Sequence, residues 1–298
     1  MSRRIGIGSL LLLLHLAAGG AAALPIDPTS STSVWDAIIY PASTPDPTGD
    51  QGTGDREGDI VGDALHAALY TLFDDAGTPS LTDGTLAFRV RMGGDSNPPG
   101  FGNFLALGID AGEDALNDID LFLGVDGQGS NDSIGIYDPG AGANVSPSTT
   151  TIANTPSVSW LLAPGATGNY DWSAVSTVND PTATITDFGA NGNDYFLTFL
   201  VPFDQIVAEL ALLGIGIDEN TTFRYVMGTG SQPNALNQDV GGTSAGWSDT
   251  TTWDLLGALS SPYTPSGGLV TAPEPSPLAL ALLGLALLGG HARRRQRR

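Results

Sequence analysis

The stretch Thr85-Leu86-Ala87-Phe88-Arg89-Val90-Arg91-Met92 decides the fold. Its apolar residues alternate with an alanine and two arginines: Leu86, Phe88, Val90 and Met92 fall on one side, and Ala87, Arg89 and Arg91 on the other. Successive side chains of a strand point to opposite faces, so a period of two predicts a strand. We therefore expect a half-buried antiparallel sheet with its core on the Leu86 side.

Similar short runs occur on both sides of this stretch, bounded by Gly, Asp, Asn and Pro. They cover residues 68–73, 101–109, 119–125, 133–137, 157–162, 182–188, 195–201 and 222–227, and a weaker apolar patch covers 34–40. Only residues 203–213 show helical spacing, after Pro202. Many short strands with a single helix are typical of an all-β, antiparallel β-sandwich, here of the jelly-roll type.

The composition divides the chain into five parts. Residues 24–58 are rich in Pro, Gly and Asp, residues 59–259 hold the predicted sandwich, and residues 260–272 have the Ser, Pro and Gly content of a linker. The two ends, 1–23 and 273–298, have the character of sorting signals. The body between them, about 240 residues, is long enough for one large all-β domain or two small ones.

The N-terminus has the three parts of a secretory signal peptide. Arg3 and Arg4 precede an apolar region, residues 10–16, and small residues including Ala21 and Ala23 follow. We expect cleavage after Ala23. A twin-arginine signal and a first transmembrane helix are the alternatives, and the short apolar region disfavours the second.

The C-terminus combines Pro273-Glu274-Pro275, a segment without charge from 276 to 292, and five arginines among the last six residues. An uncharged segment of about 17 residues reaches the lower limit for a membrane-spanning helix, and the arginines would hold its end on the cytoplasmic side. A permanent anchor and a buried core helix are the alternatives. Two prolines before the segment and an arginine cluster after it favour a sorting signal.

This tail resembles the C-terminal signal of PEP-CTERM proteins. The resemblance implies a protein that is exported by the secretion machinery, held at the inner membrane through its C-terminal helix, and cut by an exosortase-type membrane protease. Pro273, Glu274 and Pro275 would mark the cleavage region. The mature protein would then reach the cell surface or extracellular matrix of a Gram-negative-type bacterium, where it would act structurally or adhesively, with exopolysaccharide as a partner.

The body is similar, more loosely, to carbohydrate-binding family 9 and DOMON-like β-sandwiches. The similarity follows the order of a Leu-Ala-Phe-Arg-Val-Arg strand, then Gly108-Ile109-Asp110, then Asp118-Ile119-Asp120-Leu121-Phe122. It implies a non-catalytic sandwich that binds glycans.

Charge and residue types exclude several functions. Between residues 25 and 272 four arginines face 31 acidic residues, which disfavours nucleic acid as a partner. The chain has no cysteine and no lysine, which excludes thiol nucleophiles, lysine Schiff bases and P-loops. His66 is the only histidine of the body, and we expect it to be an ordinary strand or surface residue.

A carboxylate-pair enzyme of the envelope is the alternative function, because glycoside hydrolysis needs only two suitably spaced acids. The available glutamates are Glu57, Glu113, Glu209 and Glu219, and none lies in a recognisable motif. We therefore expect no enzymatic activity.

Acidic loops predict calcium. Asp110, Asp114, Asp118 and Asp120 are closely spaced in one loop, and short acids at such spacing can converge on a hard cation. The loop is no EF-hand, since Ala115 replaces the required glycine and Leu121 the final glutamate. A second acidic group, Asp50, Asp55, Asp59 and Asp63, could form a site of its own or contribute to the first. Turn formation by aspartate is the alternative for both.

Glycan binding would need an exposed aromatic platform. Trp172 and Trp247 lie in polar, loop-like surroundings, which makes them the candidates for glycan contact. Burial within the sandwich is the alternative for any of the body's tryptophans.

Overall fold

The computed structural model describes residues 26–40, 46–96, 99–112, 118–129, 132–140, 144–183, 192–243 and 251–269. Twelve strands, two α-helices and two short 3₁₀ helices occur in these ranges. In chain order they are η1 (Thr32–Val34), β1 (Asp36–Ala37), η2 (Arg56–Gly58), β2 (Leu69–Asp74), β3 (Thr85–Met92), β4 (Phe104–Ala111), β5 (Leu121–Asp126), β6 (Ser133–Tyr137), β7 (Val158–Leu161), β8 (Tyr170–Ala174), β9 (Tyr195–Pro202), α1 (Phe203–Leu212), β10 (Phe223–Gly230), α2 (Trp253–Leu256), β11 (Tyr263–Thr264) and β12 (Gly268–Leu269).

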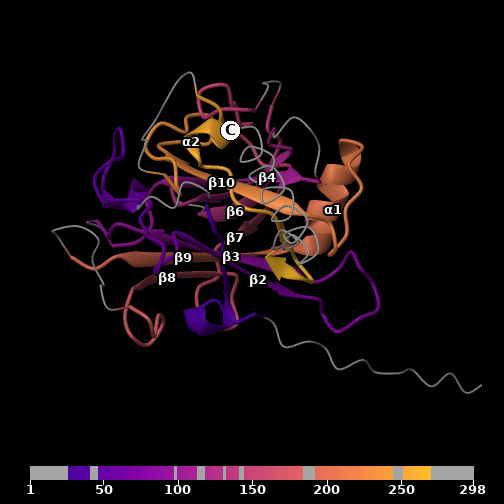
Figure 1. Ribbon diagram of the computed structural model, residues 1–298, viewed down its shortest axis with the longest axis horizontal. Helices are drawn as coiled ribbons and strands as arrows, with labels where there is room; N and C mark the ends of the chain where they lie inside the picture. Colours follow the sequence, from indigo (N-terminus) through magenta and orange to yellow (C-terminus); the bar gives the residue numbers. More distant parts are fainter. Residues whose placement is uncertain are drawn as a thin grey trace, which may run out of the picture.

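The strands form two antiparallel sheets that lie one above the other (Figure 1). One sheet has five strands in the order β1-β2-β3-β9-β8, and the other has seven in the order β12-β11-β10-β4-β5-β6-β7. The prediction of an antiparallel β-sandwich is therefore confirmed.

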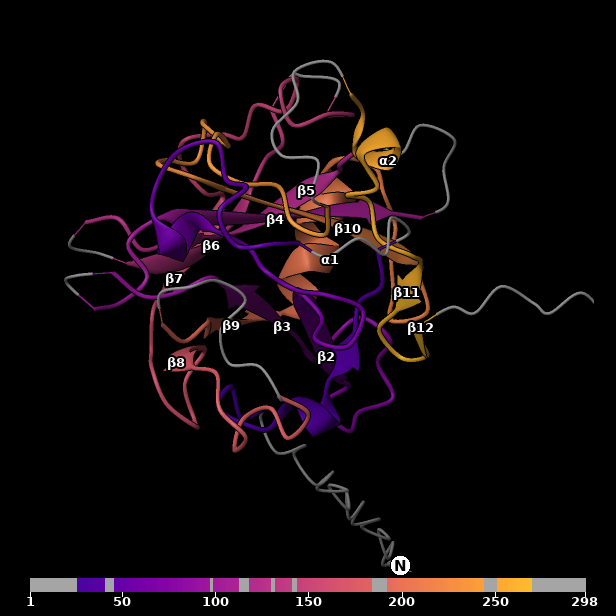
Figure 2. The same cartoon turned by 60° about the vertical axis from the view of Figure 1, so that its left-hand side comes forward.

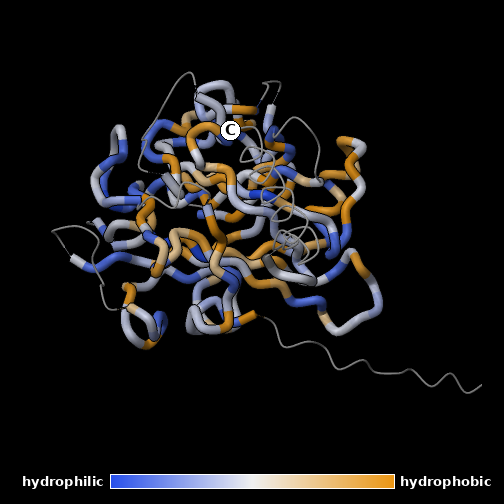
Figure 3. Tube along the Cα trace, in the orientation of Figure 1, coloured by the Kyte–Doolittle hydropathy of each residue, from blue (hydrophilic) through white to orange (hydrophobic). Residues whose placement is uncertain are grey.

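The main core lies between the sheets. Leu86, Phe88 and Val90 of β3 are fully buried on the inner face, as their alternation predicts. The Phe88 ring meets Tyr225 of β10 edge-on, with ring centroids 5.3 Å apart, which joins the two layers. Figure 3 shows apolar stretches along the strands of both layers and most hydrophilic stretches in the loops around them.

Helix α1 closes one end of the sandwich. Its buried residues Phe203, Ile206 and Leu210 lie on one face and belong to the same core as both sheets. The Phe203 ring lies 5.2 Å from that of Phe73 on β2 and 6.3 Å from that of Phe223 on β10. The predicted helix, 203–213, is thus confirmed to within one residue.

The second face of β3 differs from the expectation of a solvent-facing surface. Arg89 and Arg91 are only 1 % and 0 % exposed. Residues 26–40 and the loop after β8 cover this face, and both guanidinium groups find partners there. Arg91 Nε lies 2.8 Å from Asp194 Oδ2, and Arg91 Nη1 lies 3.4 Å from Asp180 Oδ2.

Arg89, the other arginine, holds the segment of residues 28–35 against this face. Arg89 donates to the carbonyl oxygens of Ser30 and Pro28, each at 2.7 Å, and its Nε donates to Thr198 Oγ1 at 2.9 Å. Its guanidinium also lies 4.4 Å from the ring centroid of Trp35. The folded region therefore begins well before residue 59.

The seven-stranded sheet is covered as well. Trp253, on the short helix α2, is 0 % exposed and packs with Phe104, Phe122 and Val226 on the outer face. Its Nε1 donates to the Asn144 carbonyl at 3.2 Å. Both sheets are thus buried on both sides over much of their area, which a simple two-layer prediction does not anticipate.

The segment predicted as a linker, residues 260–272, is folded over its described part. The hairpin of β11 and β12 continues the seven-stranded sheet beside β10 (Figure 2), with Tyr263 opposite Phe223. Strand β8 was not predicted, because Trp172 and its polar neighbours look like a loop. Most of the strand predicted at 182–188, and both sorting signals, lie outside the described residues.

Within the described ranges, no helix has the length and apolar character that crossing a membrane requires.

Candidate metal centre

Four aspartates from distant parts of the chain lie close together, with Asp59 next to the end of β3 and Asp239 next to β10. Asp46 and Asp50 lie in the loop before η2, Asp59 directly follows η2, and Asp239 lies in the loop after β10. Asp46, Asp50 and Asp239 each offer a carboxylate oxygen, and these three atoms lie within 4.8 Å of one another. Among the described residues no other group of three or more potential ligands meets this criterion.

Backbone N–H groups fix two of these carboxylates across the chain. Gly242 donates to Asp46 Oδ2 at 2.7 Å, and Ile60 donates to Asp239 Oδ2 at 2.7 Å. Each bond joins the N-terminal loop to the loop after β10. The backbone on each side therefore fixes a carboxylate of the other loop.

Several oxygens of the cluster lack a hydrogen-bond partner among the described residues. They are Asp46 Oδ1 and both carboxylate oxygens of Asp50. Asp46 is only 1 % exposed, so its unpaired oxygen is not compensated by bulk water. Unpaired buried acceptors are uncommon in folded proteins and point to a missing cation or donor.

The electrostatics of the cluster are unfavourable without a cation. No ion pair joins any of the four acids to a described Arg or His. Burial, reinforced by the neighbouring carboxylates, raises the pKa of Asp59 to about 7 and that of Asp239 to about 8. The same two causes raise the pKa of Asp46 well above its ordinary range. In the metal-free protein, protons therefore neutralise part of the cluster.

These raised pKa values give a pH dependence for the metal-free protein. In the unfolded chain an aspartate has a pKa of about 4. Between about pH 4 and 8 the folded cluster therefore binds more protons than the same residues bind in the unfolded chain. The contribution of the cluster to the free energy of unfolding is therefore greatest at low pH. It is lost as the pH rises through the pKa values of the folded state. With a chelator present, we expect the melting temperature to fall between pH 5.5 and 8.5.

The variant Asp50→Asn serves as the control for this measurement. This variant removes one interacting charge from the cluster, so the melting temperature should depend less steeply on pH. A melting temperature that stays level or rises over this interval would contradict the electrostatic description.

The loop predicted to bind calcium is only partly within the described residues, because Asp114 lies outside them. Asp120 Oδ2 accepts the N–H of Ala111 at 2.8 Å, and Asp110 is 4 % exposed. Asp110 lies directly across from Arg224 of β10, which provides an opposite charge nearby. The calcium prediction for Asp110, Asp114, Asp118 and Asp120 stays a prediction.

The second predicted acidic group is divided by the structure. Asp50 and Asp59 join the cluster, whereas Asp55 and Asp63 form local turns, as the alternative predicts. Asp55 accepts the N–H of Glu57 at 3.3 Å, and Asp63 accepts the N–H of Leu65 at 2.8 Å. Asp46 and Asp239 were not among the predicted ligands, because their proximity depends on the fold of both loops.

Two of the candidates for catalysis, Glu57 and His66, are engaged in structural bonds. Both carboxylate oxygens of the buried Glu57 accept backbone N–H groups, from Ser96 and Gly102, each at 2.8 Å. His66, expected to be an ordinary strand or surface residue, lies in the loop before β2 and is 3 % exposed, and its Nδ1 lies 3.1 Å from Asp63 Oδ1. Glu113 lies outside the described residues.

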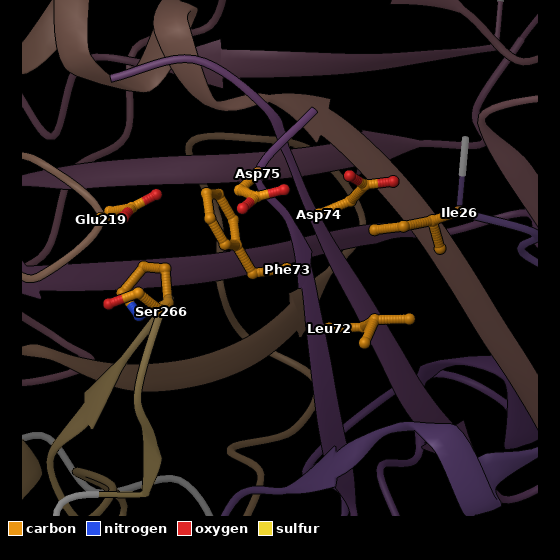
Figure 4. Close-up of a pocket in the computed structure, with 8 residues that line it drawn as sticks. Ile26, Leu72, Phe73, Asp74, Asp75, Glu219 and Ser266 are labelled. Atoms are coloured by element: carbon orange, nitrogen blue, oxygen red, sulfur yellow. The ribbon is translucent and has the colours of Figure 1, made fainter. Parts of the chain in front are cut away.

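One open pocket, of about 510 Å³, is lined by three carboxylates (Figure 4). Asp74 and Asp75 lie at the end of β2 and Glu219 approaches from the loop before β10, with the Phe73 ring between Glu219 and Asp75 in this view. Asp74 Oδ1 and Asp75 Oδ1 each accept a turn N–H at 2.9 Å.

Trp172 lines a second open pocket, of about 440 Å³, at the edge formed by β7 and β8. Its ring stacks on Tyr195 at 5.0 Å between centroids, and its Nε1 donates to Asp95 Oδ1 at 3.1 Å. Phe101 also contributes to this pocket. Trp247, the other predicted glycan contact, lies outside the described residues.

The fold and the cluster together define an acidic β-sandwich with a buried carboxylate group that could hold a metal ion. Comparisons with protein-family models, with curated proteins and with solved structures find no match to this chain. The resemblances of the tail and the body to known families therefore stay predictions.

Proposed function

We propose that this chain is an exported surface or extracellular-matrix protein that an exosortase-type protease cuts from an inner-membrane intermediate. The observation that carries the proposal is the order of Pro273-Glu274-Pro275, an uncharged apolar segment and an arginine cluster. The three-part N-terminus fits the same route. The sandwich, of the jelly-roll or DOMON-like kind, would be the mature product.

A structural or adhesive role fits the sandwich better than catalysis. Its only histidine and the buried Glu57 are engaged in bonds that hold loops. The pocket beside Trp172 combines aromatic side chains with Asp132, whose buried Oδ1 has no hydrogen-bond partner among the described residues. An apolar ring surface with a few polar groups suits a sugar, so we assign exopolysaccharide binding to this pocket.

Export and processing can be tested in a bacterium that carries an exosortase. We expect the full chain to lose its signal peptide and its tail, with a mature C-terminus near Pro273 by mass spectrometry. The double variant Pro273→Ala/Glu274→Ala should remain uncut in the inner-membrane fraction, because the protease no longer recognises it.

The variant Glu219→Ala, which changes an acid of the body, should be processed normally. An intact, soluble chain in the cytosol would contradict the proposal. An intact tail that stays in the membrane would instead support the permanent-anchor alternative.

The carboxylate-pair alternative is favoured by the pocket of Asp74, Asp75 and Glu219, since glycosidases need two acids in an open cleft. A hydrolysis screen with polysaccharides separates it from the binding role. Turnover that is abolished by Glu219→Gln or Asp75→Asn would establish an enzyme.

A further inference from the structure

We propose that Asp46, Asp50 and Asp239 bind a calcium ion that joins the N-terminal loop, residues 46–59, to the loop after β10, residues 231–243. This inference goes beyond the proposed function and does not depend on export. It rests on the convergence of three carboxylates and on the unpaired oxygen of the buried Asp46.

The donor atoms select a hard cation. The three ligands offer only oxygen, the chain has no cysteine, and His66 is engaged with Asp63 instead. Zinc and other softer metals prefer nitrogen or sulfur, whereas calcium and magnesium take carboxylate oxygens.

Calcium fits better than magnesium because the same loop has further oxygens to offer. Thr48 Oγ1 and Gln51 Oε1 are buried atoms without a hydrogen-bond partner among the described residues. Thr48 lies two residues before Asp50 and Gln51 directly after it, and neither side chain carries a charge. Calcium accepts six to eight oxygens in irregular geometry, while magnesium keeps several waters and an octahedral shell.

Asp59 acts as a positioning residue. Both of its carboxylate oxygens accept the N–H of Gly49, at 3.2 and 3.0 Å, and Gly49 immediately precedes Asp50. Asp59 is 0 % exposed, so this contact anchors the loop from inside the protein. Its charge adds to the attraction for a divalent ion.

The ion would reinforce contacts that already join the two loops. Gly52 donates to the Gln238 carbonyl at 2.7 Å, and Thr53 Oγ1 donates to the Asn237 carbonyl at 2.9 Å. A ligand from each loop makes the ion a cross-link between segments that are distant in sequence. Binding to the folded state alone then stabilises the protein by mass action.

The test uses the purified full-length chain in mild detergent, with calcium chloride as the probe and magnesium chloride as the comparison. For a dissociation constant of about 10⁻⁴–10⁻³ M, 10 mM calcium should raise the melting temperature by roughly 3–10 °C above the value in EDTA. Isothermal titration should show calcium binding that 10 mM magnesium does not abolish.

The deciding variant is Asp50→Asn, because no other described residue donates a hydrogen bond to the Asp50 carboxylate. Calcium affinity should fall by at least about tenfold, since one charged ligand is lost. In EDTA the variant should melt no lower than the wild type, because a like charge has been removed. If Asp50 had only a structural role, Asp50→Asn would instead lower the melting temperature in EDTA.

Two further variants complete the design. Asp46→Asn tests a second ligand and should also lose the calcium response, whereas Asp118→Asn, in the other acidic loop, should keep it. The proposal is overturned if calcium neither binds nor shifts the wild-type melting temperature. It is equally overturned if Asp118→Asn abolishes the response while Asp50→Asn retains it.

Discussion

Replacing Arg91 by methionine is expected to lower the free energy of unfolding by about 3–5 kcal/mol. The guanidinium is 0 % exposed and lies between Asp180 and Asp194, which are 0 % exposed as well. Methionine can fill part of the volume but leaves two carboxylates buried without their cation. The cost of an uncompensated buried charge is the reason for the large effect. Urea denaturation of the purified variant and wild type measures it.

The control is the triple variant Arg91→Met/Asp180→Asn/Asp194→Asn. Because it removes the anions together with the cation, it should regain much of the lost stability, although the hydrogen bonds of Asp180 to Thr182 are altered. A single variant as stable as the wild type would show that the buried network contributes little.

Truncating Phe88 to alanine should cost about 3–5 kcal/mol of unfolding free energy. Its side chain is 0 % exposed and contacts the rings of Phe199 on its own sheet and Tyr225 on the opposite one, with centroids 5.5 and 5.3 Å away. The change removes buried apolar surface and leaves a cavity between the layers that rigid strands cannot fill. Thermal or urea unfolding gives the value.

The matched control is Leu212→Ala at the end of α1, where the side chain is 80 % exposed. Removal of apolar atoms at this exposed position should change stability by no more than about 0.5 kcal/mol. If the two variants were equally stable, the space between the sheets would not be the core.

Most strands of the two sheets could be predicted because their sequence signals are local. The alternation around Phe88 predicts both the strand and its inner face, and the spacing after Pro202 predicts α1. The burial of Arg89 and Arg91 could not be predicted, since it depends on residues 26–40 and on the loop after β8 folding over an otherwise polar face. The hairpin of β11 and β12 was missed because its Gly, Ser and Pro content is also that of a linker.

The candidate metal site was predictable only in part. A concentration of aspartates near Asp50 and Asp59 is visible in the sequence, and it does contribute two members of the cluster. Asp239 reaches the cluster only because β10 returns the chain to the N-terminal loop. No local sequence pattern shows that Asp239 lies near this loop. The more regular spacing of the acids after Asp110 led to the prediction of a calcium site in another loop.

If the tail spans a membrane as proposed, the edge hairpin keeps the sandwich close to the lipid surface. Strand β12 ends at Leu269, and three residues separate it from Pro273. Three extended residues span only about 10 Å. While the tail remained inserted, the body would thus rest almost against the head groups, and a protease acting at Pro273 would have to work within a side chain's reach of the sheet. Release would then depend on the shape of that edge as much as on the tail itself.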